Sequence, residues 1–350
     1  MESGELRRLA GELQAYDGPA LRVMEVCGTQ THENYRLGIR SLLPPGIRLV
    51  AGPGCPVCVT PADYIDRALW LAGRPDVTVC SFGDLLRVPG GESTLALARA
   101  QGADVRVVYS PLDALELARQ NPGRQIVFLA VGFETTVPSA CLAVEKAARD
   151  HISNFSLLCA CKTMERAYYT LADRVDAFLY PGHVAAITGM AVFRRLAQQG
   201  VSGAVSGFTA GELLTALLVI ARRSGHGAFA INAYPRVVAE DGNPAARALM
   251  ERVMEPCDAR WRGLGNIPGS GLRLRETYAA FDAAERFGLP QMPEREPAGC
   301  HCGEVLRGEL EPAECSLFGR RCTPEHPVGA CMVSGEGACA ACYKYGISAC

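Results

Sequence analysis

Cysteine is the residue type whose number and spacing in this sequence point most directly to chemistry. The chain has 350 residues and 16 cysteines. A chain of this length can build its cores without disulfides, so the thiols need a chemical explanation. Half of them follow residue 299 and mark a separate C-terminal module: Cys300, Cys302, Cys315, Cys322, Cys331, Cys339, Cys342 and Cys350.

A CxxC pair, Cys55 and Cys58, stands in the sequence Gly-Pro-Gly-Cys-Pro-Val-Cys. A strand is expected at 47–51 and a helix from about residue 61, so the pair should lie at the carboxyl end of a strand, where open α/β sheets gather their sites. Two intervening residues permit a short disulfide ring. Reversible dithiol chemistry is therefore the leading interpretation, with metal ligation and an inert structural pair as alternatives.

A single thiol, Cys27, follows another expected strand at 21–26 and could face the same crevice. Thiolate is a soft ligand suited to iron, and Gly28 would let the backbone approach a bound group closely. His32 is the nearest imidazole and a weaker candidate ligand. The alternative is a buried thiol without function, because free cysteine is among the most buried residue types.

Four cysteines of the C-terminal module have the wide spacing C-x14-C-x6-C-x16-C, namely Cys300, Cys315, Cys322 and Cys339. Four thiolates from irregular loops are what a [4Fe-4S] cluster requires. Cys302 and Cys331 are alternative ligands. A zinc ion is the main competitor, although structural zinc sites usually use two close CxxC-like pairs.

The remaining candidates are weaker. Glu134 follows an expected strand at 126–131, but an acid that stabilises a helix N-terminus explains it equally well. His183 follows a strand at 177–180 and could donate a proton, although a histidine with ordinary polar contacts is the simpler interpretation. Five scattered cysteines are expected in the core: Cys80, Cys141, Cys159, Cys161 and Cys257.

Short β-branched runs alternate with helix-length segments along the chain, which predicts parallel sheets built from βαβ units. Strands are expected at 21–26, 47–51, 77–81, 105–109, 126–131, 156–159 and 177–180. Helices are expected at 61–72, 93–101, 138–150, 164–175, 185–199 and 210–223. The strands are too many for one compact sheet, so we expect two α/β lobes, 1–130 and 131–270, and a Cys-rich module at 271–350.

The charge balance and the missing motifs exclude several classes of function. There are 35 basic and 37 acidic residues, with no long run of one sign, which argues against nucleic acid or an anionic membrane as the partner. Neither GxxxxGK[ST] nor GxGxxG occurs, so nucleotide binding is not supported. The polar N-terminus and the lack of a long apolar stretch predict a cytoplasmic protein without a transmembrane segment. We expect a monomer.

Six segments together closely resemble the HypD family of hydrogenase maturation factors, and the likeness runs over essentially the whole chain. They are MEVCGTQTH at 24–32, AGPGCPVCVTP at 51–61, VGFETTVP at 131–138, YPGHVAAITG at 180–189, WRGLGNIPGSGL at 261–272 and the terminal cysteine pattern that begins with CHCGEVLRG. The combination of GPGCPVC with that terminal pattern is highly specific.

The resemblance implies two Rossmann-like α/β lobes and a small iron-sulfur module. It also implies a scaffold, not a turnover enzyme, that carries the Fe(CN)2CO unit of [NiFe] hydrogenases with a HypC-like small chaperone and a HypE-like cyanide donor. By this resemblance Cys27 holds the iron, and Cys55 and Cys58 are the redox pair. The implied ligands of the [4Fe-4S] cluster are Cys300, Cys315, Cys322 and Cys339.

The sequence departs from the family pattern at two positions beside these motifs. The usual motif is Cys-Gly-(Thr or Gly)-His, and Gln30 takes the place of its histidine. Cys161 stands where a histidine is expected before Lys162. Two other functions stay open: a cluster-dependent thiol/disulfide reductase that uses Cys55 and Cys58, and a zinc-stabilised interaction protein.

Overall fold

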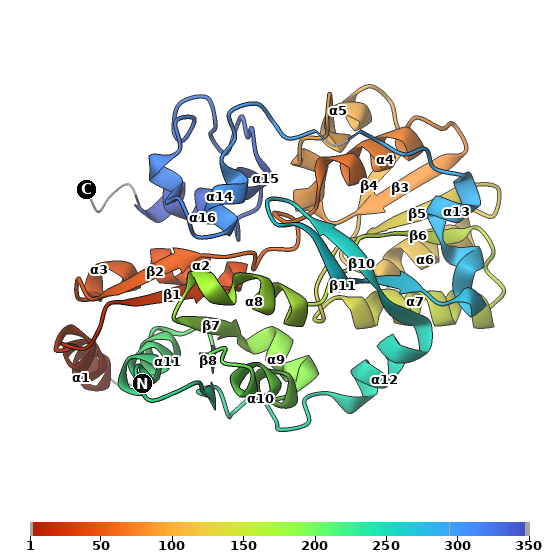
Figure 1. Cartoon of the computed structure of the whole chain (residues 1–350). Helices are drawn as coiled ribbons and strands as arrows, with labels where there is room; N and C mark the ends of the chain where they lie inside the picture. Colours follow the sequence, from red (N-terminus) through yellow and green to blue (C-terminus); the bar gives the residue numbers. More distant parts are fainter. Residues whose placement is uncertain (1–2, 294, 347–350) are drawn as a thin grey trace.

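Parallel sheets dominate the computed structural model, which describes residues 3–293 and 295–346 (Figure 1). Cys350 lies outside these residues. Sheet A has the order β2 (Ile47–Ala51), β1 (Leu21–Glu25), β7 (Ala177–Pro181), β8 (Gly203–Ser206) and β9 (Ala230–Asn232). Sheet B has the order β4 (Val105–Val107), β3 (Val77–Ser81), β5 (Gln125–Ala130) and β6 (Phe155–Cys159). All strand pairs within both sheets are parallel.

Helices cover the sheets, and several begin at the signals that favour helix starts. Thr209 and Glu212 form a capping box at the start of α11, and Ser110 caps α6, which has Pro111 in its first turn. The helices of the two lobes are α1 (Ser3–Gln14), α2 (Gly28–Arg36), α3 (Ile39–Leu42), α4 (Ala62–Ala72), α5 (Leu95–Ala100), α6 (Pro111–Gln120), α7 (Val137–Arg149), α8 (Glu165–Leu171), α9 (Gly182–Thr188), α10 (Ala191–Gln198), α11 (Ala210–Arg223), α12 (Pro244–Val253) and α13 (Ala283–Phe287).

An antiparallel hairpin joins the two lobes. Its strands are β10 (Met254–Trp261) and β11 (Gly265–Leu274), and it crosses the junction between the sheets in Figure 1. The helix before it, α12, packs on α7, while β11 packs on α8. Trp261 at the end of β10 is buried and stacks on Phe133 with the ring centroids 5.7 Å apart. The hairpin therefore contributes to the central hydrophobic core that both lobes share.

The Cys-rich C-terminal module is made of short helices and turns. It contains α14 (Cys302–Leu306), α15 (Ala330–Val333) and α16 (Ala338–Ala341). α16 packs on α2 beside sheet A, and α15 packs on the short 3-10 helix Gly83–Arg87 beside sheet B. The expected fold class is thus confirmed: an α/β protein with parallel sheets and a Cys-rich C-terminal region.

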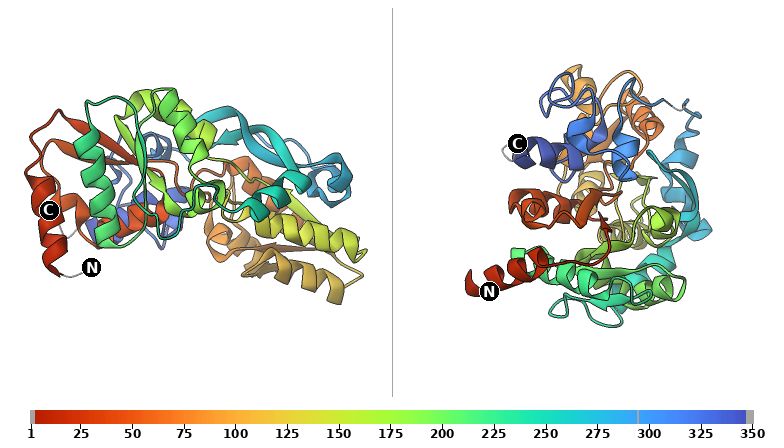
Figure 2. Two further views of the ribbon diagram at one scale, coloured as in Figure 1. Left: turned by 90° about the horizontal axis from the view of Figure 1, so that it is seen from below. Right: turned by 60° about the vertical axis from the view of Figure 1, so that its left-hand side comes forward.

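The lobes are not consecutive segments, and this differs from the division expected at residues 130 and 270. Residue 130 ends β5, whose neighbour in sheet B is β6, and residue 270 lies inside β11. The chain starts sheet A with β1 and β2, builds all of sheet B, and then returns to sheet A with β7 (Figure 2). Strand pairing over such sequence distances leaves no local signal, so composition could not reveal it.

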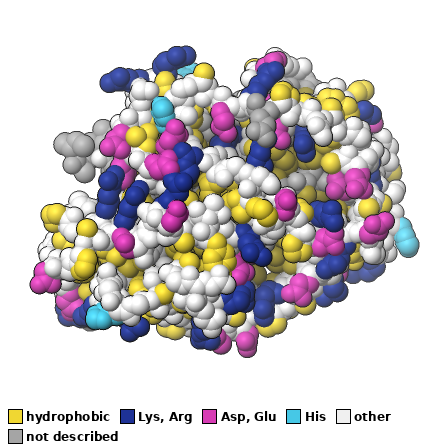
Figure 3. Space-filling model, in the orientation of Figure 1, with side chains coloured by type: hydrophobic (Ala, Val, Ile, Leu, Met, Phe, Trp, Pro, Cys, Tyr) yellow, Lys and Arg dark blue, Asp and Glu magenta, His cyan; other side chains and the backbone are white. Residues whose placement is uncertain are grey.

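On the face shown in Figure 3, basic and acidic side chains are interspersed, without an extended area of one sign. Among the described residues, no helix combines the length and the apolar character that crossing a bilayer requires.

Candidate functional site

Cys27 and the CxxC pair lie at the carboxyl ends of neighbouring strands. Cys27 is the residue before α2 and follows β1, while Cys55 and Cys58 lie in the turn after β2. The two loops touch, because the Gly28 N–H donates to the Gly54 carbonyl at 3.0 Å. The close approach requires glycine: a Cβ atom on Gly54 would lie 2.2 Å from the Cys27 nitrogen.

The surroundings of Cys27 both raise and lower the pKa of its thiol. The thiol is buried, and burial together with the nearby carboxylate of Glu336 raises its pKa to about 11. The backbone of Gln30 and Thr29 at the start of α2 lowers the pKa and so opposes this rise. Thr29 also donates from its hydroxyl to Glu336 at 2.6 Å. The backbone of Gln30 and Thr29 would favour an anionic sulfur once a cation compensates for its charge.

The side chain of Gln30 links the ends of β7 and β8. Its side chain is fully buried, and Nε2 donates to the carbonyls of Tyr180 at 3.0 Å and Ser206 at 3.1 Å. The amide therefore has a structural role in linking β7 and β8. Its Oε1 atom has no hydrogen-bond partner among the described residues.

The two candidate histidines occupy different places. His32 contacts the C-terminal module: Nδ1 lies 2.9 Å from the Gly335 carbonyl and Nε2 lies 3.4 Å from the hydroxyl of Tyr345. His183 lies at the start of α9, at the carboxyl end of β7, with its ring stacked on Phe208 at 4.1 Å. Only His183 presents an exposed ring, and partial desolvation lowers its pKa.

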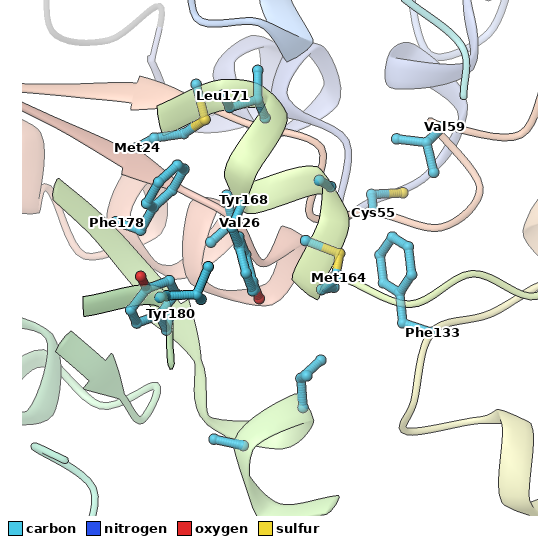
Figure 4. Packing of buried hydrophobic residues seen from close by; sticks show 14 of the residues in the cluster. Met24, Val26, Cys55, Val59, Phe133, Met164, Tyr168, Leu171, Phe178 and Tyr180 are labelled. Atoms are coloured by element: carbon cyan, nitrogen blue, oxygen red, sulfur yellow. The ribbon is translucent and has the colours of Figure 1, made fainter. Parts of the chain in front are cut away.

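Cys55 and Cys58 are both buried, and Figure 4 shows Cys55 near Phe133 and Met164 in the shared core. The Cys58 N–H donates to the Cys55 sulfur at 3.3 Å, as in a tight turn that brings the two thiols together. Burial raises the pKa of Cys58 well above its usual value, whereas Cys55 lines an open groove. The groove is also lined by Phe82, Val107 and Tyr109, whose side chain is 93% exposed.

Six cysteines of the C-terminal module line one small cavity of about 20 Å³: Cys300, Cys302, Cys315, Cys322, Cys331 and Cys339. Apolar side chains, including Leu317 and Phe318, complete its wall. In the described part of the chain, no group of three or more His, Cys, Asp or Glu side chains is arranged to hold a single metal ion. The thiols thus surround a cavity and do not converge on one point.

Cys331 links this cavity to the CxxC pair. Its sulfur lies 2.6 Å from that of Cys302, and the nearby thiols of Cys339 and Cys58 both raise its pKa. Cys58 in turn is hydrogen-bonded to Cys55. A continuous series of thiols therefore connects the C-terminal cavity with the turn that contacts the Cys27 loop.

Glu134 lies in the turn after β5, on the side of the junction that belongs to sheet B. One carboxylate oxygen accepts from the Met164 N–H at 2.9 Å, and the other is buried without a hydrogen-bond partner among the described residues. Burial raises the pKa of Glu134 to about 7. The hydroxyl of Tyr168 is also buried without a hydrogen-bond partner among the described residues (Figure 4). The charges of Glu134 and Cys27 both act on this hydroxyl and raise its pKa.

Glu336 is the site residue that sequence reasoning missed. It reaches the crevice from the far end of the chain: a Cβ atom on Gly28 would lie 2.7 Å from the Cβ atom of Glu336. The only available signal was its place in the segment SGEGAC between Cys331 and Cys339. An acid in a glycine-flanked loop carries no chemistry by itself, so its role depended on the fold.

These features define a two-lobed α/β protein with a cysteine-based site at the edge of its five-stranded sheet. Comparison with known proteins gives the family. The model of HypD, described as "Hydrogenase formation hypA family", matches residues 5–346, and the chain belongs to this family.

Curated relatives are similar over nearly their whole lengths. The chain is 46% identical to the hydrogenase maturation factor HypD of Rhodobacter capsulatus, over 98% of this chain and 94% of that protein. It is 43% identical to HypD of Azotobacter vinelandii, over 97% and 94%. It is 41% identical to HypD of Escherichia coli (strain K12), over 97% and 93%. The resemblance inferred from the sequence segments is therefore confirmed.

Proposed function

We propose that this chain acts in the maturation of [NiFe] hydrogenases, as a redox-active scaffold that carries iron while the Fe(CN)2CO unit is assembled. Membership of the HypD family supports the maturation role. The observation that carries the scaffold role is the series of thiols from the C-terminal cavity through Cys331, Cys58 and Cys55 to the loop of Cys27.

In this proposal Cys27 holds the iron of the assembling unit. The backbone of Thr29 and Gln30 lowers the pKa of this thiol, which favours negative charge on a ligand sulfur. Cys55 and Cys58 form the redox dithiol, because they are adjacent in one turn and only Cys55 borders open space. His32, a weaker candidate ligand, instead fastens α2 to the C-terminal module in this arrangement.

The donor set of the C-terminal cavity fits a [4Fe-4S] cluster, which when bound supplies single electrons. The Cys302 and Cys331 thiols lie 2.6 Å apart, and Cys58 acts on the pKa of Cys331. These two cysteines therefore lie between the C-terminal cavity and the Cys55–Cys58 dithiol. The other four would hold the cluster: Cys300, Cys315, Cys322 and Cys339. Their apolar surroundings would keep water from the cluster.

The proposal implies protein partners and a reducing compartment. A HypC-like small chaperone would share the iron with Cys27, and a HypE-like protein would deliver cyanide. Neither nucleic acid nor a membrane is required, and the chain would act as a monomer between partner encounters. Fifteen free cysteines in the described residues suit the cytoplasm, where thiols stay reduced.

Replacing Cys27 with Ala tests the scaffold role. The thiol is small, so Cys27→Ala should leave the fold intact but abolish hydrogenase maturation in a strain that lacks its own factor. Cys141→Ala, at a buried thiol of α7, is the matched control and should support normal maturation. Normal maturation by a folded Cys27→Ala chain would refute the proposal.

The two other candidate functions give different results. A thiol/disulfide reductase, favoured by the adjacency of Cys58 and Cys331, would turn over a generic disulfide without any need for Cys27. A zinc-stabilised interaction protein would contain zinc and no acid-labile sulfide after anaerobic purification. Infrared spectroscopy of the chain with a HypC-like partner distinguishes the scaffold, because bound cyanide and carbon monoxide absorb where protein groups do not.

A further inference from the structure

A second group of thiols lies at the junction of sheet B and the β10–β11 hairpin, outside the site described above. Cys159 is the last residue of β6, and Cys161 follows two residues later. The Cys159 thiol donates to the Leu272 carbonyl at 3.1 Å, and the Cys161 thiol lies 3.4 Å from the Ala130 carbonyl. The two thiols are close enough to shift each other's pKa, in opposite directions. The sequence predicted only scattered core residues here.

The backbone holds these two cysteines in a nearly extended segment. Ala160 donates to Ala130 at 2.8 Å, and Lys162 donates to Gly132 at 2.9 Å, so the segment continues beside the end of β5. Residues i and i+2 of an extended segment point to the same side, with Cα atoms at most about 7 Å apart. A disulfide spans up to about 6.8 Å, so a small bend suffices to form one.

The two thiols differ in the way that an attacking and a resolving thiol differ. Cys159 is partly exposed, whereas Cys161 is buried. The neighbouring Cys161 thiol lowers the pKa of Cys159, and the nearby Lys162 ammonium adds to this effect. The Cys159 thiol and burial raise the pKa of Cys161. The accessible sulfur is therefore the better nucleophile, with its partner in place behind it.

We propose that Cys159 and Cys161 form a second redox dithiol, which reacts with small-molecule disulfides such as glutathione disulfide. The Cys159 thiolate attacks one sulfur of glutathione disulfide, and one glutathione leaves as a thiolate that takes up a proton. Cys161 then attacks the Cys159 sulfur, and the second glutathione leaves with the Cys161 proton. The two cysteines lose two electrons and two protons in total, and glutathione disulfide gains them. This site does not depend on the role proposed for Cys27.

A third thiol is the nearest competitor for Cys159. Cys257 lies on β10 opposite Gly271, and a Cβ atom on Gly271 would be 3.0 Å from the Cys257 sulfur. The charges of Cys159 and Lys162 influence Cys257, so it belongs to the same cluster. No hydrogen bond joins the Cys257 sulfur to Cys159 or Cys161 among the described residues. Any test must therefore separate a Cys159–Cys161 bond from a Cys159–Cys257 bond.

Tryptic digestion makes this separation direct. Cleavage after Arg149 and Lys162 releases residues 150–162, which contain Cys159 and Cys161 and no other cysteine. The full chain, purified anaerobically, is treated with glutathione disulfide, unfolded, alkylated and digested. The expected result is a peptide that is not alkylated and is two hydrogen atoms lighter than its reduced form. Reduction by dithiothreitol before alkylation should restore a doubly alkylated peptide.

Two variants complete the experiment. Cys161→Ser should stop the reaction at the first step, with glutathione retained on Cys159, provided that circular dichroism shows a parent-like fold. Cys141→Ser, a nearby core thiol, should behave like the parent. The proposal is overturned if the parent peptide stays doubly alkylated, keeps glutathione on Cys159, or is recovered crosslinked to Cys257. These readings on the parent chain do not depend on the folding of any variant.

Discussion

Gly54 sets how closely the two cysteine loops approach, so Gly54→Ala is the most informative single substitution. The added methyl group would lie 2.2 Å from the nitrogen and 2.4 Å from the Cα atom of Cys27. Ordinary contacts of such atoms are about 3.5 Å, so the loops must separate by about 1 Å. Backbone lies on both sides of the clash, and neither side can turn away as a flexible side chain would.

The cost can be worked out from two contributions. Overpacking of this kind costs about 1–3 kcal/mol, and a clash with backbone belongs at the upper end. A shift of about 1 Å would also break the hydrogen bond from Gly28 to Gly54, for about 1 kcal/mol more. Gly54→Ala should therefore lower the free energy of unfolding by about 3–4 kcal/mol, and it should impair maturation because Cys27 moves away from the dithiol.

Urea denaturation measures this effect, with Gly11→Ala as the matched control. Gly11 lies in α1, and a Cβ atom there would meet nothing within 4 Å. The control should be as stable as the parent or more stable by about 0.5–1 kcal/mol, because alanine favours the helix. If Gly54→Ala unfolds at the same urea concentration as the parent, the close approach of the loops does not require glycine, and the reasoning fails.

The remaining predictions concern two buried side chains near the site. Burial raises the pKa of Glu134 from 4.5 to about 7, so the folded chain keeps a proton that the unfolded chain releases, and stability falls as pH rises through that window. Glu134→Gln should remove this slope and exceed the parent in stability by up to about 3 kcal/mol above pH 7. Urea unfolding at pH 5 and pH 8 measures it, and an unchanged slope would contradict the burial argument. Gln30→Leu leaves the carbonyls of Tyr180 and Ser206 without their donor, so it should lower the free energy of unfolding by about 2 kcal/mol in the same assay. Parent-like stability would show that these bonds contribute nothing net.

Much of the fold could be predicted because the central strands are apolar on both faces. The run Ile126–Ala130, for instance, is buried throughout and occurs in β5 as expected. The expected helix at 185–199 is two helices instead, because Gly189 adopts a φ of +73° between α9 and α10. The short strands β8 and β9 and the hairpin were not predicted, since few residues or mixed polarity give them a weak local pattern.

The candidate site could be predicted only for residues that directly follow a recognisable strand in the sequence. Strand ends placed Cys27 and the CxxC pair on one edge, because the carboxyl ends of adjacent parallel strands meet there. Glu336 reaches the same crevice through chain folding alone. The same reason hid the Cys159–Cys161 pair, whose reactivity depends on the hairpin that packs against it.

The interleaved order of the lobes has a consequence for biosynthesis. The strands of sheet B emerge from the ribosome one after another and can pair as they appear, whereas β1 and β2 can pair only with each other until β7 has been made. The loop of Glu336 emerges later still. The crevice around Cys27 is thus complete only after residue 336 has been made, so a shorter nascent chain has no assembled place for a reactive cargo.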